Sequence, residues 1–174
     1  FDPKKLWAVQ DHYMLSLSTD EKLSMMLPFL VSAQLLPESP SPDSIATVRK
    51  VIEASGDRLK VAGDILAYAD FFLLNEPPLD EAAVKQRLAK PGVQKLLTLF
   101  SAAIAELDLF EPGPLEEALK LVVTNAGVKA GDLVHAVRIA VTGKPVGPGL
   151  YDCLTIIGRD QALARIERVL PLCG

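Results

Sequence analysis

Three polar side chains near the end of the chain are spaced so that they share one face of a helix. His135, Arg138 and Thr142 stand at positions i, i+3 and i+7, opposite an apolar stripe that includes Leu133 and Val137. An arginine offers five N–H donors and no acceptor. This face predicts ligand binding. The alternative is an ordinary solvated helix face.

The residues that follow this helix form a loop with unusual backbone. Residues 142–150 read TGKPVGPGL, which is rigid at the prolines and bare at the glycines. Bare backbone lets a planar ligand approach closely and exposes N–H and C=O groups to it. Leu150 opens the next predicted helix, where unpaired N–H groups point outward. The loop therefore predicts a binding surface, and the alternative is a plain connector between helices.

Charge is unevenly distributed along the chain. The 174 residues include 18 basic and 22 acidic ones, and a net charge of −4 argues against a protein that coats nucleic acid by bulk charge. From Val128 to the end, however, six basic residues stand against four acidic ones. Such segregation is expected when one end of a protein meets a polyanion.

The sequence has no motif for bond-breaking chemistry. It has neither a phosphate-binding GxxxxGK[ST] loop nor a GxSxG or HExxH motif, and its two histidines and two cysteines are not spaced as metal ligands. Cys153 lies on an apolar stripe and is predicted to be buried. No signal peptide or membrane span is visible, and a start at Phe1 suggests a piece of a longer protein. We expect no catalytic residue, metal or cofactor in this chain.

The elements that must position these residues are helical nearly throughout. Ser18 and Glu21 form a capping box at a helix start, three prolines make residues 37–42 a loop, and Gly127 should end a helix. We predict an all-α fold, a multi-helix bundle of two small helical subdomains. Helices are expected over residues 43–55, 57–74, 80–90, 93–107, 115–126, 131–142, 150–157 and 159–170.

Two segments of the sequence resemble the bacterial-type glutamyl-tRNA synthetases. The end of the chain shares with them a helix finishing R-x-A-x-T-G, a P-G-L turn and a final G-x-x-x-A-L-x-R-I-x-R. The opening FDPKKLWAVQDHYM is similar to their FDxxKLxWxNxxYI segment, although Ala8 and Gln10 stand where Trp and Asn are usual. The matching residues are Phe1, Asp2, Lys5, Leu6, Tyr13, Arg138, Ala140, Thr142, Gly143, Pro148, Gly149, Leu150, Gly158, Ala162, Leu163, Arg165 and Arg168.

The resemblance implies a tRNA-recognition region of a class I glutamate–tRNA ligase. Residues 1–36 would end a stem-contact region, and residues 37–111 and 112–174 would be two helical anticodon-binding subdomains. A catalytic domain outside this chain would use ATP and Mg²⁺ to charge glutamate tRNA in the cytoplasm. The implied partners are that tRNA and that catalytic domain, with no membrane or DNA.

The resemblance also implies which residues meet the tRNA. Arg58 would read the last anticodon base, which is C in glutamate tRNA and G in glutamine tRNA. An unpaired C presents acceptors at its pairing edge and G presents N–H donors, so an arginine favours C. The implied anticodon contacts are Arg58, Arg138, Thr142, Gly147, Pro148 and Leu150. Possible contacts to the tRNA backbone are Lys50, Lys60, Lys144 and Arg165.

Two other functions fit the same residues. A helical protein-interaction module would show the same stripes and caps, because they do not encode a ligand. The domain could also be attached to another synthetase. Binding that does not respond to salt would favour the interaction module, since phosphate contacts impose a steep salt dependence.

Overall fold

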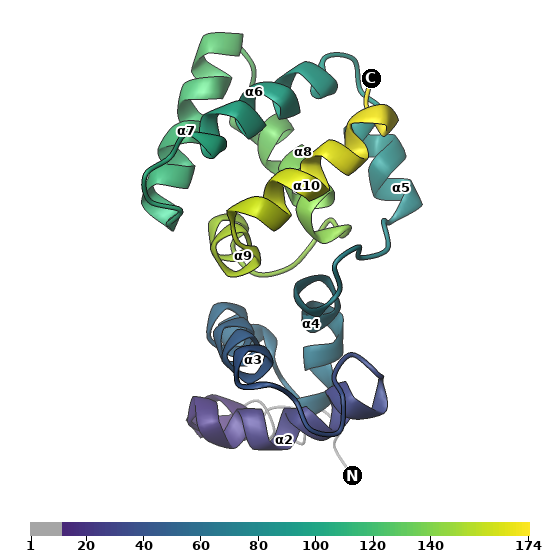
Figure 1. Ribbon diagram of the computed structural model, residues 1–174, viewed down its shortest axis with the longest axis vertical. Coiled ribbons are helices and arrows are strands. Elements are labelled where there is room, and N and C mark those ends of the chain that lie inside the picture. Colours follow the sequence, from purple (N-terminus) through teal and green to yellow (C-terminus); the bar gives the residue numbers. More distant parts are fainter. Residues whose placement is uncertain (1–11) are drawn as a thin grey trace. The chain divides into compact units, whose positions relative to one another are not determined.

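The computed structural model describes residues 12–174, and this part of the chain is built of helices and turns without a strand (Figure 1). The predicted all-α class is confirmed. The opening resemblance motif, residues 1–14, lies almost entirely outside the described residues. The chain forms two compact units, one ending at Leu74 and one spanning Asn75–Gly174.

Unit 1, which ends at Leu74, packs three helices together: α2 (Thr19–Ser32), α3 (Pro42–Ser55) and α4 (Ile65–Leu73). The predicted capping box opens α2, because Ser18 Oγ accepts from the N–H of Glu21 and Glu21 Oε2 accepts from the N–H of Ser18. Burying apolar side chains is the main force that holds such a small bundle together. Its core contains Met14, Leu23, Met26, Leu30, Leu36, Val48, Val51, Ile52, Leu59, Ile65, Ala69 and Phe71.

The helix predicted from Asp57 begins later than the sequence indicated. Two 3₁₀ turns, Gly56–Arg58 and Ala62–Asp64, occupy this stretch before α4 starts. The Asp64 carboxylate accepts from the backbone N–H groups of Lys60 (2.7 Å) and Val61 (3.0 Å). A short acidic side chain that satisfies nearby N–H groups competes with a helix, which explains why the prediction was wrong here.

Unit 2 (Asn75–Gly174) is a bundle around a central helix. Helix α5 (Glu81–Ala83) continues into a π-helical turn, Val84–Leu88, and a last 3₁₀ turn spans Leu170–Leu172. The other helices are α6 (Val93–Ala105), α7 (Pro112–Ala126), α8 (Ala130–Thr142), α9 (Leu150–Ile157) and α10 (Arg159–Val169).

Helix α8 is the centre of this core. Seven of its residues are buried, on more than one face, and it contacts α6, α7, α9 and α10 (Figure 1). A helix with apolar residues on several faces belongs in a core. Gly127 ends α7 in the left-handed conformation at φ +66°, as predicted. Cys153 is fully buried, which confirms that prediction.

The predicted boundaries after residues 36 and 111 fall inside the two units. Residues on both sides of position 111 share one hydrophobic core, because α6 packs directly on α7. The sequence 111–114 starts α7, with a proline in its first turn. The division in the described chain lies between Leu74 and Asn75.

Candidate functional site

Arg138 is bonded to the loop that follows its own helix. It lies on α8, partly exposed, and its Nη1 donates to the carbonyl oxygen of Pro148 at 2.8 Å. The same carbonyl oxygen lies 3.7 Å from Sγ of Cys153, a weaker donor. One bond uses only one of the five N–H donors of a guanidinium. Arg138 therefore holds the loop in place and keeps donor capacity for a ligand.

Thr142 shapes the loop from inside. Its side chain is fully buried, and its hydroxyl donates to the carbonyl oxygen of Arg138 (2.8 Å) and accepts from the N–H of Lys144 (3.1 Å). A threonine that bonds back by four residues satisfies the last carbonyls of a helix. Thr142 therefore forms the base of the loop, and its contact with the anticodon stays a prediction.

The loop itself, residues 144–149, has a buried end and an exposed tip. Pro148 and Leu150 are buried, Gly147 is half-buried, and Leu150 opens α9 with only 5% of its surface exposed. At the tip, Val146 is 71% exposed. The backbone and proline ring near the predicted pocket are thus fixed by packing.

Val146, at the loop tip, was not among the predicted site residues. Val146 stands between Pro145 and Gly147, outside the apolar stripe of any predicted helix. The sequence therefore already indicated that its side chain has no core to pack into. A single exposed valine is ordinary on a protein surface. Val146 is an exposed apolar side chain in the loop that Arg138 binds.

Arg58 and its neighbours lie in unit 1. Arg58 ends the 3₁₀ turn after α3 with its side chain exposed, while Leu59 beside it is buried and anchors the turn. Lys50 is exposed on α3, and Lys60 is half-buried. The structure therefore groups the predicted residues as Lys50, Arg58 and Lys60 in one unit and Arg138, Thr142, Lys144, Gly147, Pro148 and Leu150 in the other.

Arg165, a possible contact to the tRNA backbone in the sequence analysis, is buried in unit 2. Only 3% of it is exposed, and Nη1 donates to the carbonyl oxygen of Val141 at 2.6 Å. Burial, and secondly the charge of Arg168, lower the pKa of Arg165 to about 10. The signal was present in the sequence, since Arg165 stands on the α10 stripe with Ala162, Ile166 and Val169. In this structure Arg165 bonds to the end of α8, and its contact with the tRNA backbone stays a prediction.

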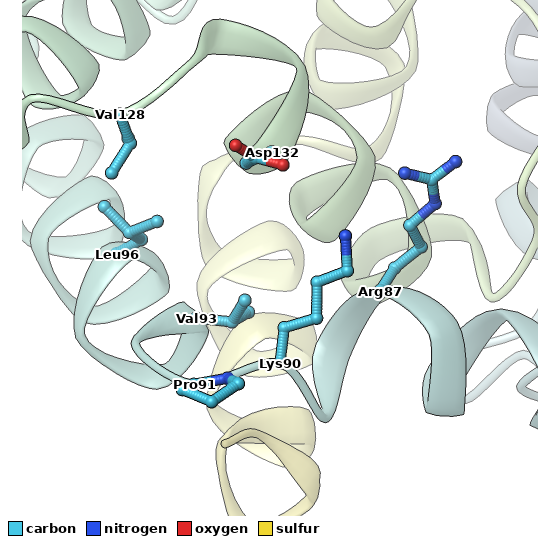
Figure 2. Close-up of a pocket in the computed structure, with 7 residues that line it drawn as sticks. All are labelled: Arg87, Lys90, Pro91, Val93, Leu96, Val128 and Asp132. Atoms are coloured by element: carbon cyan, nitrogen blue, oxygen red, sulfur yellow. The ribbon is translucent and has the colours of Figure 1, made fainter.

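The pocket drawn in Figure 2 lies at the other end of α8. It has a volume of about 280 Å³, and Val128 and Asp132 bring the start of α8 to its wall. At 1.5 Å rise per residue, Asp132 and Thr142 are about 15 Å apart along the helix. The pocket is therefore separate from the loop. Its lining residues are Arg87, Lys90, Pro91, Val93, Leu96, Val128 and Asp132.

The described chain shows neither a metal-binding cluster nor a membrane-spanning helix. Residues 12–174 contain no group of three or more His, Cys, Asp or Glu placed to hold a metal ion. In the same range, no helix combines the length and the apolar character needed to cross a membrane.

Known proteins resemble this chain along nearly its full length. Curated glutamate–tRNA ligases from Moorella thermoacetica and Desulforudis audaxviator are 31% identical over 168 residues and 29% identical over 176 residues. These matches cover 97% and 100% of this chain but 34% and 35% of the relatives. The chain thus spans about a third of the length of the curated relatives it matches.

Solved structures share the fold. The chain superposes on a glutamate tRNA ligase from Elizabethkingia meningosepticum, crystallised in complex with its amino acid, with a TM-score of 0.84 and 21% identity. That match covers 100% of this chain and 33% of the other. A glutamate-tRNA synthetase from Elizabethkingia anophelis gives a TM-score of 0.77 at 22% identity, over 98% of this chain and 32% of that one.

A family model covers most of the described helices. It is described as an anticodon binding domain, and it matches residues 21–170, which run from the first turn of α2 to the end of α10. The chain belongs to this family of anticodon-binding domains.

Proposed function

We propose that this chain recognises the anticodon of glutamate tRNA for a glutamate–tRNA ligase. The curated relatives are named glutamate–tRNA ligases, and the chain corresponds to about a third of their length. The rest of the proposed enzyme would include a catalytic domain that uses ATP and Mg²⁺ in the cytoplasm. This chain would position the tRNA for that domain.

The observation that carries the proposal is the bond from Arg138 to Pro148, which fixes a loop whose tip is exposed. A base that has left its stack needs a flat surface and donors for its edge. Val146 supplies apolar surface, and Arg138 supplies donors that are already held in place. Fixed geometry lowers the entropy lost when the RNA binds.

We further propose that Arg58 discriminates at the last anticodon position. Its side chain is exposed at the end of a turn that the buried Leu59 anchors, so it can reach a ligand without unfolding anything. An arginine only donates, so it pairs with the acceptors of C and opposes the donors of G. A base contact of this kind is worth about 1–3 kcal/mol of discrimination.

The test is a binding measurement with the 174-residue chain and two RNAs. Glutamate tRNA and a version with an exchanged anticodon would be compared at two salt concentrations. Arg138→Ala should weaken binding to the first RNA and remove the preference for it. The matched control is Arg87→Ala, which also removes one partly buried arginine of unit 2 but lies near the far end of α8.

Arg58 has its own arm in this test. Arg58→Ala should reduce the preference for C over G at the last anticodon position by about five- to a hundredfold. Arg49→Ala is its control, because Arg49 lies on α3 of the same unit and pairs with Asp20. Equal binding of both RNAs by the unmutated chain would contradict the proposal. Binding of a protein partner that ignores salt would instead favour an interaction module.

A further inference from the structure

Unit 2 begins with a segment, residues 75–80, that runs over the surface without helical bonds of its own. Two side chains of α10 bind its backbone. Gln161 Nε2 donates to the carbonyl oxygen of Asn75 at 2.6 Å, and Arg168 Nη2 donates to that of Pro77 at 2.9 Å. Gln161 and Arg168 stand seven residues apart, which places them on one face of α10, two turns apart.

A third contact, an ion pair, lies at the exposed side of this attachment. Arg168 Nη1 lies 3.8 Å from Oε2 of Glu76, and Arg168 is largely covered while Glu76 is exposed. An ion pair in such a position contributes little by itself. The two bonds to carbonyl oxygens, made by side chains that are already partly buried, carry the attachment.

The far end of the same segment touches the base of the loop. The N–H of Asp80 donates to the carbonyl oxygen of Gly143 at 2.8 Å. Gly143 has φ +75°, and a Cβ added to it would overlap the carbonyl oxygen of Pro78. Gly143 is also the residue after Thr142, whose hydroxyl sets the path of Lys144. The segment and the loop therefore meet with no space between them.

We propose that Arg168 and Gln161 are positioning residues for the loop 144–149, acting through segment 75–80 and Gly143. The inference rests on the proposed function, because it assigns to this loop the role of anticodon contact. Side chains on α10 hold the segment, the segment holds Gly143, and Gly143 starts the loop. A site that must fit one RNA needs such a supporting layer, since a loop with small side chains supplies little rigidity.

The experiment follows the loop directly, without RNA. Amide NMR signals of Gly143, Gly147 and Gly149 would be recorded for the unmutated chain, Arg168→Ala, Gln161→Ala and the double variant. We expect these three signals to move in Arg168→Ala and to move further in the double variant. In Arg168→Lys the three signals should lie closer to their positions in the unmutated chain, since an ammonium can still donate to the carbonyl oxygen of Pro77.

Arg159→Ala is the matched control. Arg159 also lies on α10 and also donates to a backbone carbonyl, that of Leu107, and it stacks over the ring of Phe110. Its loss should therefore cost similar stability while the three loop signals stay in place. If Arg168→Ala does not fold, Gln161→Ala and Arg168→Lys decide the question. Loop signals that stay unmoved in the folded variants overturn the proposal.

RNA binding separates this inference from the proposed function. Arg168→Ala should weaken binding to the glutamate anticodon stem-loop by about five- to tenfold, the loss expected for about one hydrogen bond, and Arg159→Ala should not. If the unmutated chain ignores the anticodon, the proposed function is wrong, whatever the loop signals do. If the unmutated chain reads the anticodon and Arg168→Ala reads it equally well, the positioning role is wrong.

Discussion

Arg138 and Pro148 are ten residues apart and joined by a hydrogen bond of 2.8 Å between Nη1 and a backbone carbonyl oxygen. The bond connects the middle of the central helix α8 to the last turn of the loop that leaves it. Because the loop is made largely of glycine and proline, it has few side chains with which to hold itself. Its shape therefore depends on a residue outside it.

The first prediction concerns the mobility of this loop. Arg138→Ala removes a bond from a charged donor to a partly buried carbonyl, and it should lower the free energy of unfolding by about 1–3 kcal/mol. The heteronuclear NOE values of Val146 and Gly147 should fall, since the loop loses its tie to α8. Arg87→Ala should leave both values unchanged. Equal NOE values in Arg138→Ala and the unmutated chain would show that packing alone orders the loop.

The second prediction isolates the buried hydroxyl of Thr142. Thr142→Val keeps the shape of the side chain but removes the hydroxyl that accepts from the N–H of Lys144. Losing a hydrogen bond of this kind costs about 0.5–1.5 kcal/mol, so urea unfolding should show a loss of that size. Thr142→Ser keeps the hydroxyl and should lose clearly less. A Thr142→Val variant as stable as Thr142→Ser would mean that the hydroxyl is not needed.

The third prediction separates backbone strain from close approach. Gly143 and Gly127 both end helices with positive φ, at +75° and +66°. A Cβ at Gly127 would meet open space, whereas at Gly143 it would overlap the carbonyl oxygen of Pro78. Gly127→Ala should therefore cost about 1–2 kcal/mol from strain alone. Gly143→Ala should cost more, by thermal or urea unfolding. Equal losses would show that segment 75–80 moves away freely.

The fourth prediction concerns the pKa of Glu21 and the stability that depends on it. Hydrogen bonds from the side chain and the backbone N–H of Ser18 lower the pKa of Glu21 below its usual 4.5. A carboxyl with a lowered folded-state pKa adds stability above its unfolded pKa, and this contribution disappears as the pH falls through the folded value. A ¹³C NMR titration should show the low pKa, and Ser18→Ala should bring it back toward 4.5. An unchanged titration in Ser18→Ala would assign the shift to another cause.

The sequence by itself determined the features that depend on neighbours along the chain. Helix ends are marked by local bonds and backbone conformation, at Ser18 with Glu21, at Gly127 and at Gly143. The helices of unit 2 after residue 92 lie close to where such local signals predicted them. The all-α class followed from the same signals. The resemblance motif placed the loop, because its small residues and prolines are recognisable without any partner.

Only the tertiary structure decided which partners the polar side chains bind. Arg138 and Arg165 look alike as charges in a sequence, yet one reaches a loop at the surface and the other is buried against the end of α8. Burial depends on which helix packs on which face. The bonds of Arg168 and Gln161 to residues 75–77 join positions more than 80 residues apart, and no local pattern encodes such a contact. The supports of the loop therefore emerge only when the helices assemble, because packing brings their faces together.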